Sequence, residues 1–116
     1  MAHYEEWLKR HSGYIERDLR CALDHEQRGK VEWGDWWRER YHAACVQARG
    51  EAMMHARYAR ARNERDMVAT WVSVARSMHR KGMGWWTVGR EGYALPIREY
   101  PPTNYGYAVE GNVAEQ

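Results

Sequence analysis

The sequence contains no Phe and very little Lys or Ile. Lys is confined to Lys9, Lys30 and Lys81, and Ile to Ile15 and Ile97. Arg, Ala, Gly, Val and Trp are used instead, so residues with AT-rich codons are avoided. This bias indicates a gene from a GC-rich bacterium or from one of its phages.

Long apolar runs are also missing. No stretch approaches the roughly 18 residues that a membrane-spanning helix needs, and residues 1–6 show no basic region followed by an apolar core. We therefore expect a cytoplasmic protein with no signal peptide and no membrane contact. The 44% hydrophobic and 29% charged residues are typical of a folded globular chain. A length of 116 residues favours a single domain over 1–116.

Enzyme signatures are absent as well. The chain has no glycine-rich phosphate loop, no His-Glu-x-x-His and no Gly-x-Ser-x-Gly elbow. Its serines are Ser12, Ser73 and Ser77, and none of them lies in a recognisable nucleophile motif. We therefore expect a protein that is not an enzyme and has no cofactor.

Charge is distributed unevenly along the chain. The net charge of the whole chain is +2. Residues 1–33 sum to −1, residues 34–82 to +5 and residues 83–116 to −2. A basic middle segment between mildly acidic flanks favours an acidic partner surface or a nucleic acid.

Apolar side chains recur at intervals of three and four along the first 80 residues. This spacing is that of an amphipathic helix, and it predicts long helices over 3–28, 35–62 and 64–81. The second helix carries an alanine-rich stripe against which a neighbouring helix, or a second copy in a homodimer, can pack closely.

The helix ends are read from glycine and capping residues. Gly29 and Gly34 are expected to bracket the first turn, with Asp35 as the N-cap of the second helix. Asn63 is the expected cap of the third helix. Because the apolar stripe keeps its phase across Asn63, one continuous helix over 35–81 is an open alternative.

The periodicity changes after Gly82. Residues 85–88 and 93–97 flank the Gly-rich segment 89–92, which predicts a C-terminal β-hairpin followed by an irregular tail. The expected fold is therefore mainly α with a small β element, in the α+β class.

Cysteine and histidine form a possible metal site. Cys21 and His25 lie one helical turn apart, as do His42 and Cys45. An antiparallel hairpin of the first two helices would bring the pairs together as a tetrahedral zinc set. The alternative is that both cysteines are small buried fillers.

Arginines cluster towards the end of the second helix. They can follow the phosphates of a nucleic acid, pair with carboxylates of a partner protein, or form a solvated helix face. No helix-turn-helix spacing accompanies them. The candidate binding residues of this cluster are Arg49, Arg57, Arg60, Arg62 and Arg65.

Tryptophan is unusually dense, with seven in the chain. Neighbouring residues point about 100° apart on a helix and to opposite faces on a strand, so one member of each pair, Trp36-Trp37 and Trp85-Trp86, is expected to reach the surface. Trp and Arg are the preferred anchors of protein interfaces. The candidate anchors are Trp33, Trp37 and Trp86, unless Trp and Tyr only replace Phe in the core.

These observations favour a non-enzymatic protein-binding module. Size, gene composition and the lack of catalytic motifs are compatible with small phage-encoded inhibitors that occlude a host protein or nucleoprotein complex, anti-CRISPR proteins among them. The alternative is a nucleic-acid-binding regulator that uses the basic helix face over 49–65.

Overall fold

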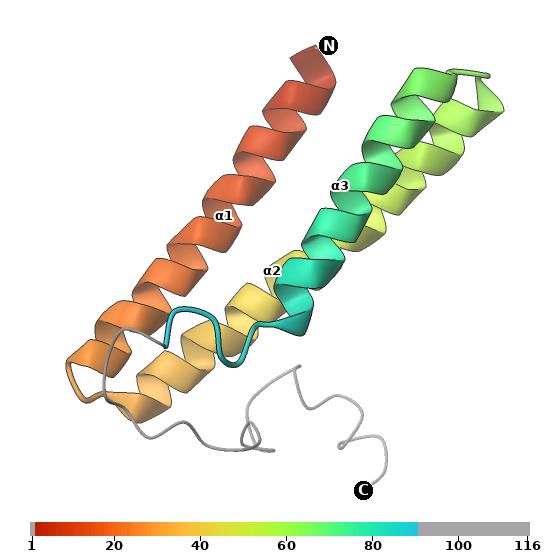
Figure 1. The fold of residues 1–116 in the computed structure, drawn as a ribbon. Coiled ribbons are helices and arrows are strands. Elements are labelled where there is room, and N and C mark those ends of the chain that lie inside the picture. Colours follow the sequence, from red (N-terminus) through yellow and green to blue (C-terminus); the bar gives the residue numbers. More distant parts are fainter. Residues whose placement is uncertain (1, 91–116) are drawn as a thin grey trace, which may run out of the picture.

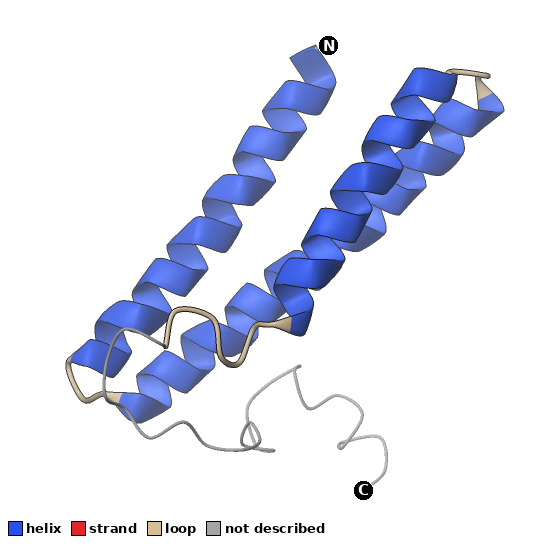
Figure 2. Ribbon diagram, viewed as in Figure 1, coloured by secondary structure: helices blue, strands red, loops and turns tan. Residues whose placement is uncertain are grey.

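The computed structural model describes residues 2–90, which form three long helices (Figure 1). They are α1 (Ala2–Gln27), α2 (Val31–Ala61) and α3 (Arg65–Met83). The central helix α2 runs antiparallel to both of the others and packs against each. Helices make up 85% of the described residues, and no strand occurs among them (Figure 2).

Both helix connections are short turns with a residue in the left-handed region. Gly29 has φ 78° between α1 and α2, and Asn63 has φ 59° between α2 and α3. In each turn the next N–H donates back five residues, from Lys30 to the His25 carbonyl and from Glu64 to the Ala59 carbonyl. This is the Schellman pattern that terminates helices. The chain therefore breaks at Asn63, and the alternative of one helix over 35–81 is wrong.

The core lies along the inner face of α2. Ala48, Ala52, Ala56 and Ala59 are almost completely buried, and their small side chains let the neighbouring helices approach closely. Large aromatic rings join the outer helices across α2, because Trp7 of α1 meets Trp71 of α3 with ring centroids 5.0 Å apart. The bundle is thus closed by small residues on the central helix and by tryptophans on the outer two.

The predicted β-hairpin, and with it the α+β class, is wrong. Residues 84–90 continue from α3 as hydrogen-bonded turns, in which the Thr87 and Val88 N–H groups donate to the Gly84 carbonyl. The Trp85 carbonyl accepts from the Arg38 side chain rather than from a partner strand. Arg38 of α2 thus takes one of the carbonyls that a partner strand would have bound. The second predicted strand, 93–97, lies outside the described residues.

The start of α2 also differs from the prediction. The helix begins at Val31, so Gly34 and Asp35 lie inside it and not in the turn. Asp35 is fully buried and does not cap the helix. Gly34 is needed for close packing, because a Cβ at this position would lie 2.5 Å from the Glu26 Cγ of α1. The first turn of α2 is therefore pressed directly against the end of α1.

Candidate protein-binding surface

Three tryptophans gather at the beginning of α2. Trp33, Trp36 and Trp37 follow the i, i+3, i+4 spacing that places side chains on one helix face. Trp33 is 56% exposed and Trp36 38%, while Trp37 is half-buried. The Trp36 ring meets Trp33 and Trp37 edge to face, with centroids 5.9 and 5.0 Å apart. The three rings thus form one continuous aromatic surface.

Two polar side chains border these rings. The Arg40 guanidinium lies 4.9 Å from the centre of the Trp36 ring and 5.8 Å from that of Trp37. The His25 ring lies 6.2 Å from Trp33, across the α1–α2 turn. A guanidinium over an aromatic face is held by a cation–π attraction and keeps its N–H groups available to a carboxylate. We call His25, Trp33, Trp36, Trp37 and Arg40 the tryptophan patch.

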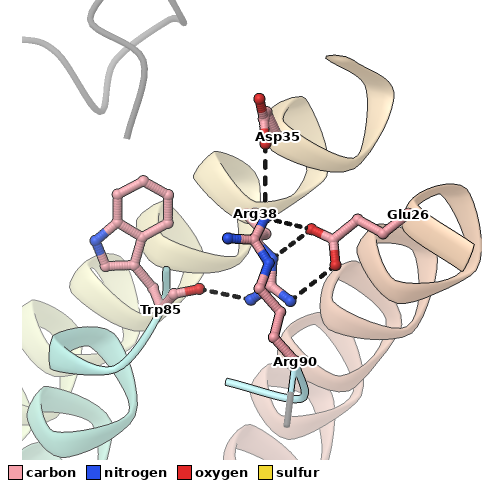
Figure 3. A network of polar contacts seen from close by, with 5 residues as sticks. All are labelled: Glu26, Asp35, Arg38, Trp85 and Arg90. Atoms are coloured by element: carbon pink, nitrogen blue, oxygen red, sulfur yellow. Dashed lines mark hydrogen bonds and ion pairs between the residues drawn. The ribbon is translucent and has the colours of Figure 1, made fainter. Parts of the chain in front are cut away.

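A buried ion network lies at the same end of the bundle (Figure 3). Arg38 of α2 donates two hydrogen bonds to the Glu26 carboxylate of α1, at 2.6 and 3.0 Å, and a third to the Trp85 carbonyl at 2.9 Å. Arg90 donates to the same carboxylate at 2.7 Å and lies 3.7 Å from Asp35. We call Glu26, Asp35, Arg38 and Arg90 the ion network. It joins α1, α2 and the segment after α3.

The four charges of the ion network balance, and none is more than 5% exposed. A fifth acid, Glu39, is 2% exposed, and neither of its oxygens has a hydrogen-bond partner in residues 2–90. Burial, reinforced by the nearby Asp35 charge, raises the pKa of Glu39 to about 7. Because these groups are shielded from solvent, their arrangement suits holding the helices in place rather than acting on a substrate.

The structure separates the residues that the sequence suggested as partner anchors. Trp33 and Trp37 lie together in the tryptophan patch. Trp86 is 7% exposed beneath the Arg90 guanidinium, 4.5 Å from its ring centre, so its predicted surface position is wrong. Trp36 was missed, although its spacing of three from Trp33 and four from Arg40 is visible in the sequence.

The arginine cluster lies at the other end of α2. Arg57, Arg60, Arg62 and Arg65 are exposed around the α2–α3 turn. Arg49 is half-buried, and its Nη1 lies 2.9 Å from His79 Nδ1 of α3. Between Trp36 and Arg60 the helix rises roughly 36 Å. The tryptophans and the arginines are therefore two surfaces, not one.

The proposed zinc ligands are not gathered into a site. Within residues 2–90, no three His, Cys, Asp or Glu side chains are placed to share a metal ion. His42 stacks on Trp85 with centroids 5.0 Å apart, and Cys45 is 1% exposed. Burial raises the pKa of the Cys45 thiol to about 11. Cys21 and His25 are half-buried on α1.

No protein-family model, curated protein or solved structure matches this chain. None of the described helices is long and apolar enough to cross a membrane.

Proposed function

We propose that this chain is a non-enzymatic binding protein that docks on a partner protein through the tryptophan patch. The observation that carries the proposal is the group of three adjoining indoles, two of them more than a third exposed, beside an arginine. Contiguous exposed aromatic surface is costly in water and commonly marks an interaction site. Trp and Arg are also the residue types most enriched among the anchors of interfaces.

Rigidity supports the same proposal. Apart from His25, the patch lies on the first turns of α2, which the ion network and the close Gly34 contact fix against α1. Indole rings lose little conformational entropy on binding when they are already held by edge-to-face contacts. A surface that is preorganised in this way uses more of its contact energy for affinity.

The chemistry of the patch indicates what the partner offers. The indoles suit an apolar pocket, and Arg40 suits a carboxylate at the border of that pocket. A more specific proposal is that the partner is a host protein or nucleoprotein complex, which the chain inhibits by occluding it. It is supported by the small size of the chain and by the composition of its gene.

The test is affinity capture from a nuclease-treated lysate of the source host with three full-length baits. They are the unmodified chain, Trp33→Ala/Trp36→Ala, and the control Met54→Ala/Tyr58→Ala. The control removes two side chains that are about half exposed on the second half of α2. We expect a stoichiometric protein to be retained by the unmodified and control baits. The tryptophan variant should bind it at least about 30-fold more weakly, since the loss of a single such anchor costs about 2 kcal/mol.

Two results would contradict the proposal. One is a partner that binds the tryptophan variant as tightly as the unmodified chain. The other is a partner lost equally from both variants while circular dichroism shows both folded, because binding would then not distinguish the patch from the rest of α2.

A further inference from the structure

A second surface is defined by charge. Residues 2–48 carry eight basic and nine acidic side chains, for a net −1, whereas residues 49–83 carry eight basic and three acidic, for a net +5. The positive charge of the described chain is thus concentrated on α3 and on the second half of α2. This surface is independent of the tryptophan patch and of the function proposed for it.

Two of the three acids in this region are already engaged. Glu51 accepts from the Trp7 indole at 3.1 Å and lies 3.2 Å from His11 Nε2, so it is directed at α1. Glu64 pairs with Arg62 at 3.4 Å. Within residues 2–90, the arginines at 57, 60, 65, 76 and 80 have no acidic partner. Most of the positive charge is therefore left for a ligand.

The free arginines of α3 lie along one line. Arg65, Arg76 and Arg80 are exposed and project within about 60° of one another around the helix axis. The line from Arg65 to Arg80 is roughly 22 Å long. Ala69 and Ser73 lie between them, also exposed, and their short side chains let a broad ligand approach the helix.

Helix α2 adds cations at both ends of this line. Arg60 and Arg65 line one hollow of about 350 Å³ beside the α2–α3 turn. Arg49 and His79 line a cleft of about 260 Å³ between the two helices, nearer the end of α3. We call Arg49, Arg60, Arg65, Arg76 and Arg80 the basic face.

We propose that the basic face binds the phosphate backbone of a nucleic-acid duplex. A duplex carries one charge per roughly 1.7 Å of its axis, so the guanidiniums at both ends of a line about 22 Å long can each meet phosphates. The surface between Arg65 and Arg76 presents the short side chains of Ala69 and Ser73, not the large apolar centre that is typical of protein interfaces. Guanidiniums also match phosphate oxygens in a bidentate geometry. The contacts are to the backbone and carry no base specificity.

The test is fluorescence anisotropy with a labelled DNA duplex of about 20 base pairs, titrated with the full chain between about 50 and 200 mM salt. The variant is Arg76→Gln/Arg80→Gln. The matched control is Arg10→Gln/Arg20→Gln, which removes the same charge from exposed positions of α1. Loss of two phosphate contacts should weaken binding about tenfold and lower the slope of log K against log salt by about 1.8. The control should change neither by more than about twofold.

The proposal is overturned if the unmodified chain does not bind the duplex at the lowest salt, or if its affinity does not depend on salt. It is also overturned if the α1 control loses as much affinity as the α3 variant, or if polyglutamate displaces the duplex as effectively as an unlabelled duplex does. Trp33→Ala/Trp36→Ala should leave the affinity for DNA unchanged. Failure here is therefore distinguishable from failure of the tryptophan patch.

Discussion

The two turns of this bundle have the same backbone geometry and opposite side-chain chemistry. Both have a left-handed residue, Gly29 or Asn63, and both close with a hydrogen bond back five residues, at 2.8 and 2.9 Å. At the α1–α2 end the four charges of the ion network are buried, and the rings of Trp33 and Trp36 are exposed. At the α2–α3 end the charges are exposed, and Arg62–Glu64 is an ion pair of 3.4 Å in solvent. The backbone motif thus decides where the chain reverses, and the side chains around it decide what each end presents to a partner.

The largest expected difference between the two ends is in how much their ion pairs contribute to the free energy of unfolding. Arg38→Ala leaves the buried Glu26 carboxylate with one of its two cations removed and should lower the free energy of unfolding by about 3–5 kcal/mol. Arg62→Ala removes a solvent-exposed pair and should cost at most about 1 kcal/mol. Urea denaturation of both variants measures the contrast, and equal losses would mean that the ion network does not fix this end.

The next effect is a pH dependence from Glu39. Its pKa is raised from 4.5 to about 7 in the folded chain, so the folded state holds a proton that the unfolded state releases. The protonated Glu39 contributes its full stabilisation below pH 4.5. This stabilisation is lost as the pH rises through about 7, and the free energy of unfolding then falls by about 3 kcal/mol at most. Glu39→Gln should remove this loss.

The measurement is the difference in unfolding free energy between the unmodified chain and Glu39→Gln at pH 5 and pH 8. Burial lowers the pKa of His42 and His55, and this acts in the opposite direction, destabilising the fold as the pH falls through their range. Because both histidines are present in both proteins, the difference isolates Glu39. A difference independent of pH would show that Glu39 is ionised in the fold.

A smaller effect distinguishes two glycines of α2. Gly34→Ala places a Cβ against Glu26 and should destabilise the fold by about 1–3 kcal/mol. Gly50→Ala meets nothing within 4 Å and should stabilise the helix by about 0.5–1 kcal/mol, because Gly is a poor helix former. Thermal unfolding reports both signs. A stabilising Gly34→Ala would contradict the close packing of α1 on α2.

The helices could be predicted from the sequence because their apolar periodicity is local. The break at Asn63 is predicted by its capping side chain, but the apolar stripe keeps its phase across it, so the sequence also left one continuous helix open. The left-handed conformation of Asn63 decides for the break. The predicted start of α2 at residue 35 is wrong, because the helix begins at Val31. The Gly34-Asp35 pair is typical of a turn and cap, but Gly34 is there to admit Glu26 and Asp35 to face Arg90.

The sequence predicts that tryptophans form a binding surface, but not which of them are exposed. The excess of Trp pointed to an interaction surface, but which rings reach the surface depends on what covers them. Trp86 is covered by Arg90, and this contact forms in the segment after α3, where the sequence predicted a hairpin. The ion network joins residues up to 64 positions apart, so no local pattern predicts it. Arg76 and Arg80 of α3 were not among the candidate residues, although their alignment with Arg65 follows from the predicted helix over 64–81.

The most direct test of docking through the tryptophan patch is hydrogen exchange at the two ends of α2. It compares the free full-length chain with the chain in complex with its captured partner. Binding through the tryptophan patch predicts added protection of backbone amides in residues 31–40 and little change in residues 57–65. Protection of 57–65 with none in 31–40 would contradict the claim and assign the partner to the arginine end.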